Sequence, residues 1–290
     1  PKRLLIFSGL IVVIYGFMQA FLGIGLTSEQ IVWTDGAMFP GLKTRVFSTW
    51  QNPNLLGGYF DLMLGLMAGM FLLIKHKIVR IVIAVLFCLT AFCLTLTYAR
   101  GACLSIALVI FVYSILYNRK VLLALIGLAV ILLLSDATLV DRMTSIFTKM
   151  DTSSEMRLAF WESTIAMILD HPLLGIGWGS YFMVYPNYDY YMQGNFIKIV
   201  HAHNMYLNFM AEIGLFGFAS YMVCFFGVIY KAFKAQVMKL DILVKAMFLG
   251  IGLGLSALAL NGFTDYVMFN TELSMLVWLF SGIVVSGYKN

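Results

Sequence analysis

The stretch His201–Phe218, HAHNMYLNFMAEIGLFGF, places polar side chains at the start of a run that is otherwise apolar enough for a membrane. Within it, Asn204, Asn208 and Glu212 recur at four-residue steps, so on a helix they form one polar stripe about 12 Å long. Such a stripe must face protein or water rather than lipid. His203 lies at the entrance of the helix, and an imidazole can take a proton from a hydroxyl near neutral pH. His203 is therefore the best candidate for a general base.

Other interpretations of these polar residues stay open. His201 and His203 could bind a metal, but two ligands without a nearby cluster of carboxylates or thiols fall short of a recognisable site, so we predict none. Both histidines could instead only form hydrogen bonds at a helix end. On a regular helix Glu212 lies about half a turn away from His203, so we expect it to order the stripe or bond neighbouring backbone. We assign His201, Asn204, Asn208 and Glu212 to substrate binding.

Two arginines stand beside the expected membrane segments. Arg100, in LTYARGACLS, lies between two apolar runs with hardly any loop around it, and a charge in such a place usually marks a site. Arg45 begins RVFSTWQNPNLLGGY, in which Asn52-Pro53-Asn54 predicts a turn that caps the next helix. A helix N-terminus beside a guanidinium is suited to binding an anion. The alternatives are that Arg100 snorkels to headgroups or pairs with Asp61, and that the turn only caps a helix.

Arg157 is expected in the first turn of a helix within DTSSEMRLAFWESTIAMILDHP. A cation there opposes the helix dipole and needs a partner, which Glu155, Asp151 or a phosphate could supply. With Arg45 and Arg100 it would make three anion-binding side chains. Asp265 and Glu272, on the last outer loop, could pair with these arginines.

The composition indicates that these residues belong to a membrane protein. Apolar residues make up 61% of the 290-residue chain and charged residues only 11%, so it is an integral membrane protein. We predict an all-α polytopic fold, in one membrane domain spanning residues 1–290. Its eight expected crossings are Leu4–Leu26, Leu55–Ile74, Ile81–Ala99, Ala102–Tyr117, Val121–Ser135, Met205–Tyr230, Ala246–Gly262 and Glu272–Tyr288.

The distribution of charge predicts the topology. With the N-terminus inside, the inner connections hold twelve of the 19 Lys and Arg residues and one acid, Asp241. The positive-inside rule then places both termini in the cytoplasm. The net charge of +5 is thereby explained without nucleic acid. Because the chain begins Pro-Lys-Arg, we expect it to be the C-terminal part of a longer protein.

Two outer connections are longer than turns, at residues 27–54 and 136–204. In the second, a capping box from Thr152 to Glu155 predicts a helix start, and His171-Pro172 predicts its end. This helix has one apolar face, so we expect it at the membrane interface or over the spans.

The glycines predict packing and bends rather than chemistry. Gly175, Gly177 and Gly179 fit a phosphate loop only loosely, because no strand precedes them and no Lys-Ser/Thr follows, so a bend is the favoured interpretation. Gly214, Gly217 and the pair Gly250 and Gly254 are expected where helices pack closely. The four cysteines have no metal or redox spacing and are expected to be inert.

Four stretches, in order and spacing, resemble the O-antigen ligase and polymerase family of bacterial envelope proteins. They are RVFSTWQNPNLLGGY, TYARGACLS, RLAFWESTIAMILDHPLLGIGWGSY and HAHNMYLNFMAEIGLFGF. The resemblance implies a GT-C-like membrane glycosyltransferase at the outer face of the bacterial cytoplasmic membrane, without cofactor or metal and with inversion at the sugar. Its donor would be a glycan on undecaprenyl diphosphate, and its acceptor another lipid-linked glycan, lipid A core or a protein.

The resemblance further implies that Arg45, Arg100 and Arg157 hold the diphosphate and that His203 activates the acceptor hydroxyl. A transporter or flippase of lipid-linked sugars is the main alternative, and a structural scaffold is a third. A transporter predicts polar residues near the membrane midplane on several spans, whereas this sequence gathers them near one face. A scaffold would not need three arginines in apolar surroundings.

Overall fold

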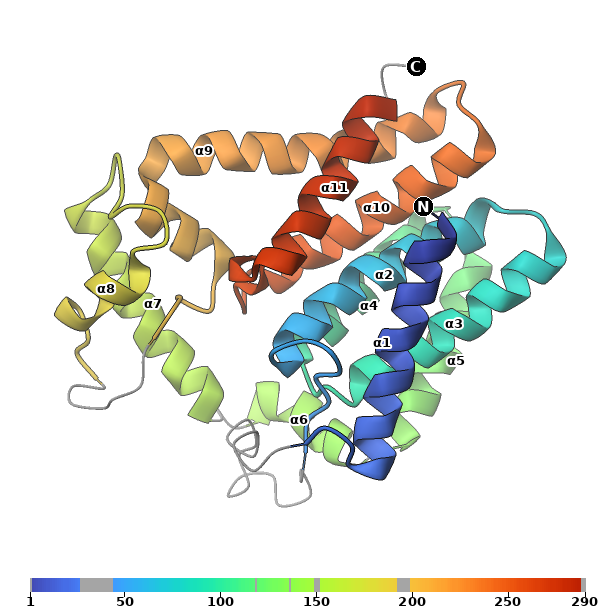
Figure 1. The fold of residues 1–290 in the computed structure, drawn as a ribbon, viewed down its shortest axis with the longest axis horizontal. Helices are drawn as coiled ribbons and strands as arrows, with labels where there is room; N and C mark the ends of the chain where they lie inside the picture. Colours follow the sequence, from blue (N-terminus) through green and yellow to red (C-terminus); the bar gives the residue numbers. More distant parts are fainter. Residues whose placement is uncertain are drawn as a thin grey trace.

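The structure is a computed structural model, and it describes residues 2–26, 44–117, 119–135, 137–148, 152–191 and 199–287. The described residues form helices and no strand (Figure 1). The α-helices are α1 (Lys2–Leu22), α2 (Pro53–Leu73), α3 (Lys77–Thr95), α4 (Arg100–Tyr117), α5 (Arg119–Ser135), α6 (Ala137–Thr148), α7 (Thr152–Asp170), α8 (Tyr181–Val184), α9 (Met205–Lys234), α10 (Ile242–Asn261) and α11 (Thr271–Gly287). Short 3-10 turns are η2 (Tyr185–Asn187), η3 (Ala235–Val237) and η4 (Val267–Phe269).

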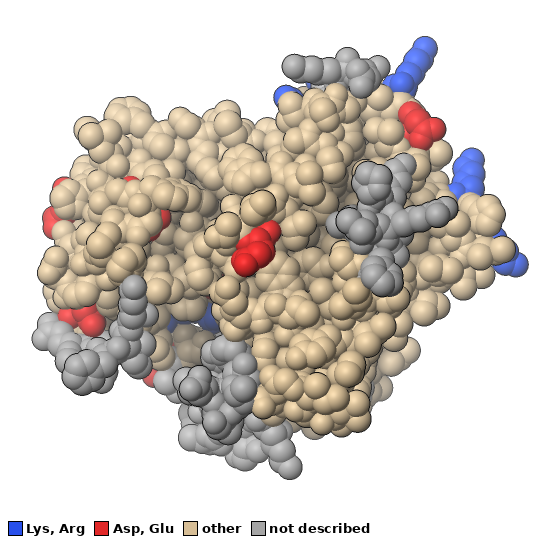
Figure 2. All heavy atoms as spheres, viewed as in Figure 1, with Lys and Arg blue, Asp and Glu red and all other residues tan. Residues whose placement is uncertain are grey.

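The all-α membrane architecture is confirmed, whereas the count of eight crossings stays a prediction. Four helical stretches are long and apolar enough to cross a bilayer, namely Pro53–Leu73, Lys77–Thr95, Met205–Val237 and Ile242–Asn261. Three more apolar helical stretches are shorter, namely Ser8–Leu22, Arg100–Leu116 and Thr271–Gly287. Apart from atoms at the bottom of one hollow, most of the Lys and Arg atoms seen in Figure 2 lie at the upper right, where Figure 1 places the α2–α3 turn and the connection into α10.

Helices α2 and α10 form the centre of the bundle and touch through their backbones. A Cβ atom on Gly65 would lie 2.3 Å from the Gly254 nitrogen, and one on Gly69 would lie 2.2 Å from the Gly250 nitrogen. Small residues four apart on both helices therefore allow this approach, which confirms the predicted packing role of Gly250 and Gly254. The close crossing brings the N-terminal end of α2 beside the C-terminal end of α10.

Helix α9 is broken at Gly214, where a single straight span was expected. Gly214 has φ 63° and ψ −175°, a conformation available essentially only to glycine. The segment before it turns away from the long segment after it and lies against α7 and α8 (Figure 1). Gly214 therefore makes a sharp bend in α9, in addition to the close packing that the sequence indicated.

The loop after α7 supplies hydrogen bonds to the broken helix. The N–H groups of Ile176 and Gly177 donate to the carbonyls of Ala211 and Glu212, at 2.8 and 2.9 Å. In return Leu215 N–H donates to the Pro172 carbonyl at 2.9 Å. Gly175 and Gly177 belong to this joint, so the bend interpretation of the glycine-rich segment is confirmed.

Helix α7 ends at Asp170, directly before the predicted stop at His171-Pro172. With α8 and the start of α9 it forms a lobe that has a small apolar core of its own. The buried members of that core are Phe160, Met167, Tyr181, Tyr185 and Ala202. The lobe thus carries residue 157 on a packed helix rather than on a free loop.

The contact between α2 and α10 gives a test of the fold. We expect Gly65→Leu to lower the free energy of unfolding by about 1–3 kcal/mol or more, because the new side chain meets backbone that cannot move aside. The control is Gly282→Leu, whose Cβ meets nothing within 4 Å. Thermal unfolding of both variants in detergent measures the effect, and equal midpoints would contradict the predicted contact.

Candidate active site

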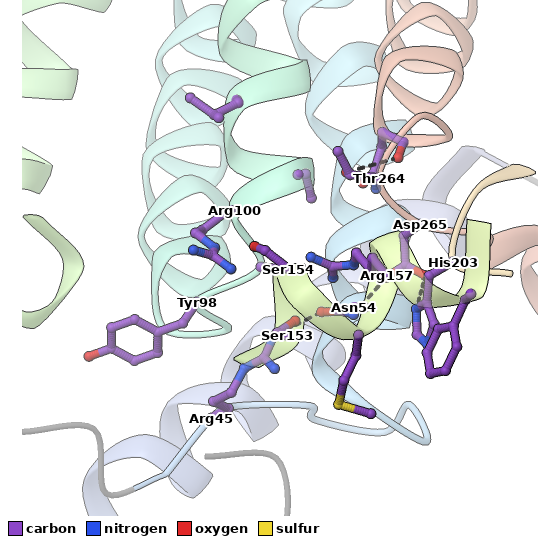
Figure 3. Close-up of a pocket in the computed structure, with 17 residues that line it drawn as sticks. Arg45, Asn54, Tyr98, Arg100, Ser153, Ser154, Arg157, His203, Thr264 and Asp265 are labelled. Carbon is purple, nitrogen blue, oxygen red and sulfur yellow. Dashed lines mark hydrogen bonds and ion pairs between the residues drawn. The ribbon is translucent and has the colours of Figure 1, made fainter. Parts of the chain in front are cut away.

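One cavity of about 330 Å³ lies where the lobe meets the bundle (Figure 3). A hollow with Lys or Arg atoms at its floor is visible between them in Figure 2. Five regions far apart in sequence contribute residues. They are the segment before α2 with the start of that helix, the α3–α4 turn with the start of α4, α7, the loop before α9, and the end of α10 with the loop after it. The polar residues that line it are Arg45, Asn54, Tyr98, Arg100, Ser153, Ser154, Arg157, His203, Asn261, Thr264 and Asp265.

Arg45 is held in place at the edge of the cavity. Its Nε donates to the Thr97 carbonyl at 2.8 Å and its Nη2 donates to Asn54 Oδ1 at 2.8 Å. The backbone around it is also fixed, because Val46 N–H donates to the Leu96 carbonyl. Asn52 caps α2 as the sequence predicted, by accepting from the N–H groups of Asn54 and Leu55.

Arg100 is the first residue of α4 and is only 9% exposed. The turn before it is tight, because Tyr98 has φ 51° and Ala99 N–H donates to the Thr97 hydroxyl. A Cβ on Gly101 would lie 2.4 Å from Thr264 Oγ1, so α4 begins in close contact with the end of α10. The local fold therefore fixes the place at which the Arg100 side chain enters the cavity.

Arg157 extends from α7 toward the same space (Figure 3). Its Nε is buried and has no hydrogen-bond partner among the described residues. A buried donor without a partner is unfavourable by about 1–3 kcal/mol, so this nitrogen is suited to an anionic ligand. Guanidinium groups form bidentate bonds with phosphate oxygens, and three of them line this one cavity.

His203 pairs with an acid that the sequence did not assign to it. Its Nδ1 lies 3.1 Å from Asp265 Oδ1. Burial alone would raise the pKa of Asp265, but His203, followed by Arg157, outweighs burial and lowers it below its usual value. An ionised carboxylate can only accept, so it accepts from His203 Nδ1–H and leaves Nε2 as the ring nitrogen that can face a substrate.

The backbone and an aromatic ring fix the orientation of the imidazole. His203 has φ 49°, a left-handed conformation that is uncommon outside glycine, and the Phe160 ring stacks on it at a centroid distance of 5.8 Å. The backbone N–H of His203 donates to His201 Nδ1 at 3.2 Å. Such a strained, over-determined position is frequent at functional sites.

Asn54 joins this pair to Arg45. Asn54 Nδ2 donates to Asp265 Oδ2 at 2.6 Å, while Asn54 Oδ1 accepts from Arg45. One chain of hydrogen bonds therefore runs from a guanidinium through an amide and a carboxylate to the imidazole. Sequence reasoning interpreted Asn54 as part of a cap and proposed Asp265 as a partner of the arginines, so it missed both links to His203.

The remaining predicted substrate-binding residues are buried outside this cavity and bond backbone. Asn204 caps α9 and donates to the Phe263 carbonyl, and Asn208 accepts from Ala202 N–H. Glu212 accepts from Tyr181 N–H at 3.3 Å, a backbone bond of the kind expected for it. His201 is 5% exposed and lines a smaller cavity of about 130 Å³ beside His203 and Asp265.

His201, His203 and Asp265 also form a possible metal cluster, with ligand atoms within 4.8 Å of one another. The sequence showed no cluster of carboxylates or thiols near the two histidines, and the fold brings one carboxylate, Asp265, to them. Two features of the structure disfavour a metal ion at this cluster. Asp265 already accepts from Asn54 and Tyr266 N–H, and the arginines lining the adjoining cavity repel positive charge.

The burial of His201 predicts how stability depends on pH. Burial, followed by the neighbouring His203, lowers the pKa of His201 to about 3, whereas an unfolded histidine titrates near 6.5. The buried His201 therefore makes its full contribution to the free energy of unfolding above about pH 6.5. As the pH falls below this value the unfolded state gains a proton that the folded state does not, and the free energy of unfolding decreases by up to about 1.4 kcal/mol per pH unit. We expect His201→Asn, which keeps an acceptor for His203 N–H, to reduce this slope between pH 6.5 and 5. Thermal unfolding against pH measures it, and equal slopes in both proteins would contradict the assignment.

Comparison with known proteins gives a match to one family model. No match emerges among curated proteins or among solved structures. A family model described as O-antigen ligase, Wzy_C, matches residues 83–222. This part of the chain, which runs from α3 into α9 and carries Arg100, Arg157 and His203, is similar to the O-antigen ligase family.

Proposed function

We propose that the protein is a glycosyltransferase that moves a glycan from a lipid diphosphate, of the undecaprenyl type, to an acceptor hydroxyl. The observation that carries the proposal is the meeting of Arg45, Arg100 and Arg157 with the His203–Asp265 pair around one cavity. Such a reaction needs positive charge for a diphosphate leaving group and a base for a hydroxyl. The family match supports this type of activity in general terms.

In the proposed reaction the arginines bind the diphosphate oxygens. The acceptor oxygen attacks the anomeric carbon, its proton passes to His203 Nε2, and the bond from that carbon to the phosphate oxygen breaks. The lipid diphosphate leaves with the electron pair of that bond, and attack opposite the leaving group inverts the anomeric centre. Asp265 stabilises the resulting imidazolium, as a carboxylate beside a histidine base does.

Arginines can supply the charge that a metal provides in other phosphate-transfer sites, so the proposed reaction needs no metal. The acceptor is proposed to be a lipid-linked glycan, lipid A core or a protein, which makes the chain a polymerase or a ligase. We place the site on the extracytoplasmic side of the cytoplasmic membrane, because the expected inner connections carry most of the cations.

A transporter or flippase of lipid-linked sugars is the competing hypothesis. It predicts polar groups spread along several spans near the midplane. Among the described residues, Asn54 and Arg100 lie at the N-terminal ends of α2 and α4, and Asn261 lies at the C-terminal end of α10. Because these cavity residues lie together at helix ends, they favour a reaction at one membrane face over transport through the midplane.

Replacing the base or an arginine tests the proposed reaction. With a purified undecaprenyl diphosphate glycan and candidate acceptors, we expect His203→Ala to slow transfer by about 10²–10⁴-fold, because proton removal is lost. Arg157→Ala should slow it by about 10²–10³-fold, because leaving-group charge is less well stabilised. The control is Arg80→Ala, since that guanidinium lies over the Phe71 ring on the α2–α3 hairpin, away from the cavity residues.

Equal transfer by wild type, His203→Ala and Arg157→Ala would refute the site assignment. Movement of lipid-linked glycan between leaflets, unaffected by His203→Ala and without any transfer product, would favour the transporter.

The carboxylate partner of the base gives a second test. We expect Asp265→Asn to lower kcat by roughly 10²-fold or more, because an amide no longer holds the Nδ1–H tautomer or stabilises the imidazolium. The KM for the donor should change much less than kcat. The control is Asp170→Asn, because Asp170 accepts from the Tyr188 hydroxyl on the exposed side of the lobe. A fall in kcat of similar size in both variants would show a general effect of the acid-to-amide change.

A further inference from the structure

An exposed apolar patch covers the joint between α7 and the break in α9. Its side chains are large, and each is at least 46% exposed. They are Leu169, Leu173, Leu174, Trp178, Leu215 and Phe216, and we call them the joint patch. Leu174 is the most exposed at 79%, and Trp178 is 66% exposed. Contiguous apolar surface of this kind marks a site of contact with a membrane or another protein.

The joint patch cannot bury itself by a small rearrangement. Its loop is tied to α9 by the three main-chain hydrogen bonds that join residues 172, 176 and 177 to residues 211, 212 and 215. Gly175 and Gly214 pack against backbone, since a Cβ on Gly214 would lie 2.3 Å from the Leu173 oxygen. Trp178 rests on Phe209 with its ring stacked at 5.7 Å. The exposed side chains therefore stand on a rigid frame.

The composition around the patch indicates lipid as its partner. Residues 172–184, PLLGIGWGSYFMV, contain no charged side chain, and neither do residues 213–230. Acids of the lobe are bonded to tyrosines instead, with the Tyr188 hydroxyl on Asp170 and the Tyr191 hydroxyl on Glu162. Tyrosine and tryptophan are enriched at the boundary between lipid and water.

The patch is also continuous with the exposed face of a candidate membrane span. Phe216, Val223, Phe226 and Tyr230 recur along α9 at helical spacing and are 44–73% exposed. From Leu215 to Lys234 this segment rises about 29 Å, close to the roughly 30 Å of a bilayer hydrocarbon core. Lys234 lies against the Tyr230 ring at the far end, with Nζ 5.5 Å from the centroid. The patch thus lies at the opposite end of a membrane-length helix from an anchoring lysine.

We propose that the joint patch is a membrane-docking surface that inserts Leu173, Leu174 and Trp178 into the adjacent lipid leaflet. The lobe then rests on the bilayer at two places, through α9 and through the loop after α7. Because α7 is continuous with that loop, the docking fixes the height of Arg157 and of the cavity relative to the headgroups. This inference concerns the lobe surface and holds whether or not the proposed transfer reaction is correct.

Quenching of Trp178 fluorescence tests the proposal. The protein is placed in phosphatidylcholine nanodiscs with or without lipid brominated at carbons 6 and 7, and the spectrum of Trp178→Phe is subtracted from that of the wild type. We expect the brominated lipid to remove at least half of the Trp178 emission. Iodide in the aqueous phase should have little effect on it.

A tryptophan moved to another exposed position of the lobe serves as the control. Tyr190 is 59% exposed and follows Asp189, so in Trp178→Phe/Tyr190→Trp we expect iodide to quench more strongly than brominated lipid. In Trp178→Phe/Leu174→Trp the lipid quenching should return, which keeps the test valid if position 178 itself proves sensitive. Quenching of Trp178 by iodide but not by lipid would overturn the proposal. Shielding from both quenchers would also overturn it, because a protein would then cover the patch.

Discussion

The backbone contact between α2 and α10 is the constraint on which the rest of the site depends. Gly65 and Gly69 on one helix and Gly250 and Gly254 on the other leave no room for side chains between them. The N-terminal end of α2 therefore comes to lie beside the C-terminal end of α10. Only at that separation can Asn54 reach the carboxylate that follows α10. Packing in the middle of the bundle thus sets a hydrogen-bond distance at its end.

Charged groups in a poorly solvated part of the protein are stabilised by the series of hydrogen bonds that links Arg45, Asn54, Asp265 and His203. Asp265 is buried, and both of its oxygens accept hydrogen bonds from the surrounding protein. An ionised carboxylate in such surroundings is tolerable only when donors and positive groups compensate it. The imidazole and the nearby guanidiniums meet this need, and the carboxylate in turn orients the imidazole. Each member of the chain is therefore positioned by its neighbours as well as by its own helix.

Local sequence signals predicted much of this structure. The Asn52 cap and the end of α7 before His171 are confirmed, because each depends on residues close together in the chain. The close packing at Gly250 and Gly254 is also confirmed, because small residues four apart mark a helix face that can approach another helix, although the sequence did not show that this helix is α2. The three arginines and His203 were selected as charged or polar groups in apolar surroundings, and they line one cavity. Their chemical roles stay predictions.

What sequence reasoning missed depends on distant contacts. The hydrogen bond from Asn54 to Asp265 joins residues 211 positions apart, and the sequence around either residue does not predict the other as its partner. The break at Gly214 was likewise not foreseen, because a glycine in an apolar run is usual where helices pack. The carbonyls freed by the break are satisfied by a loop more than 30 residues earlier in the chain. Helical periodicity alone could not supply that partner.

The joint between this loop and α9 has a consequence for how the sequence can diverge. Its three bonds are all made by main-chain groups, so they do not depend on side-chain identity at Pro172, Ile176 or Leu215. They do depend on the number of residues between His171 and Gly177, because one inserted or deleted residue would shift each amide away from its carbonyl. Relatives that keep this joint should therefore vary in composition here while preserving length and the glycine at the break.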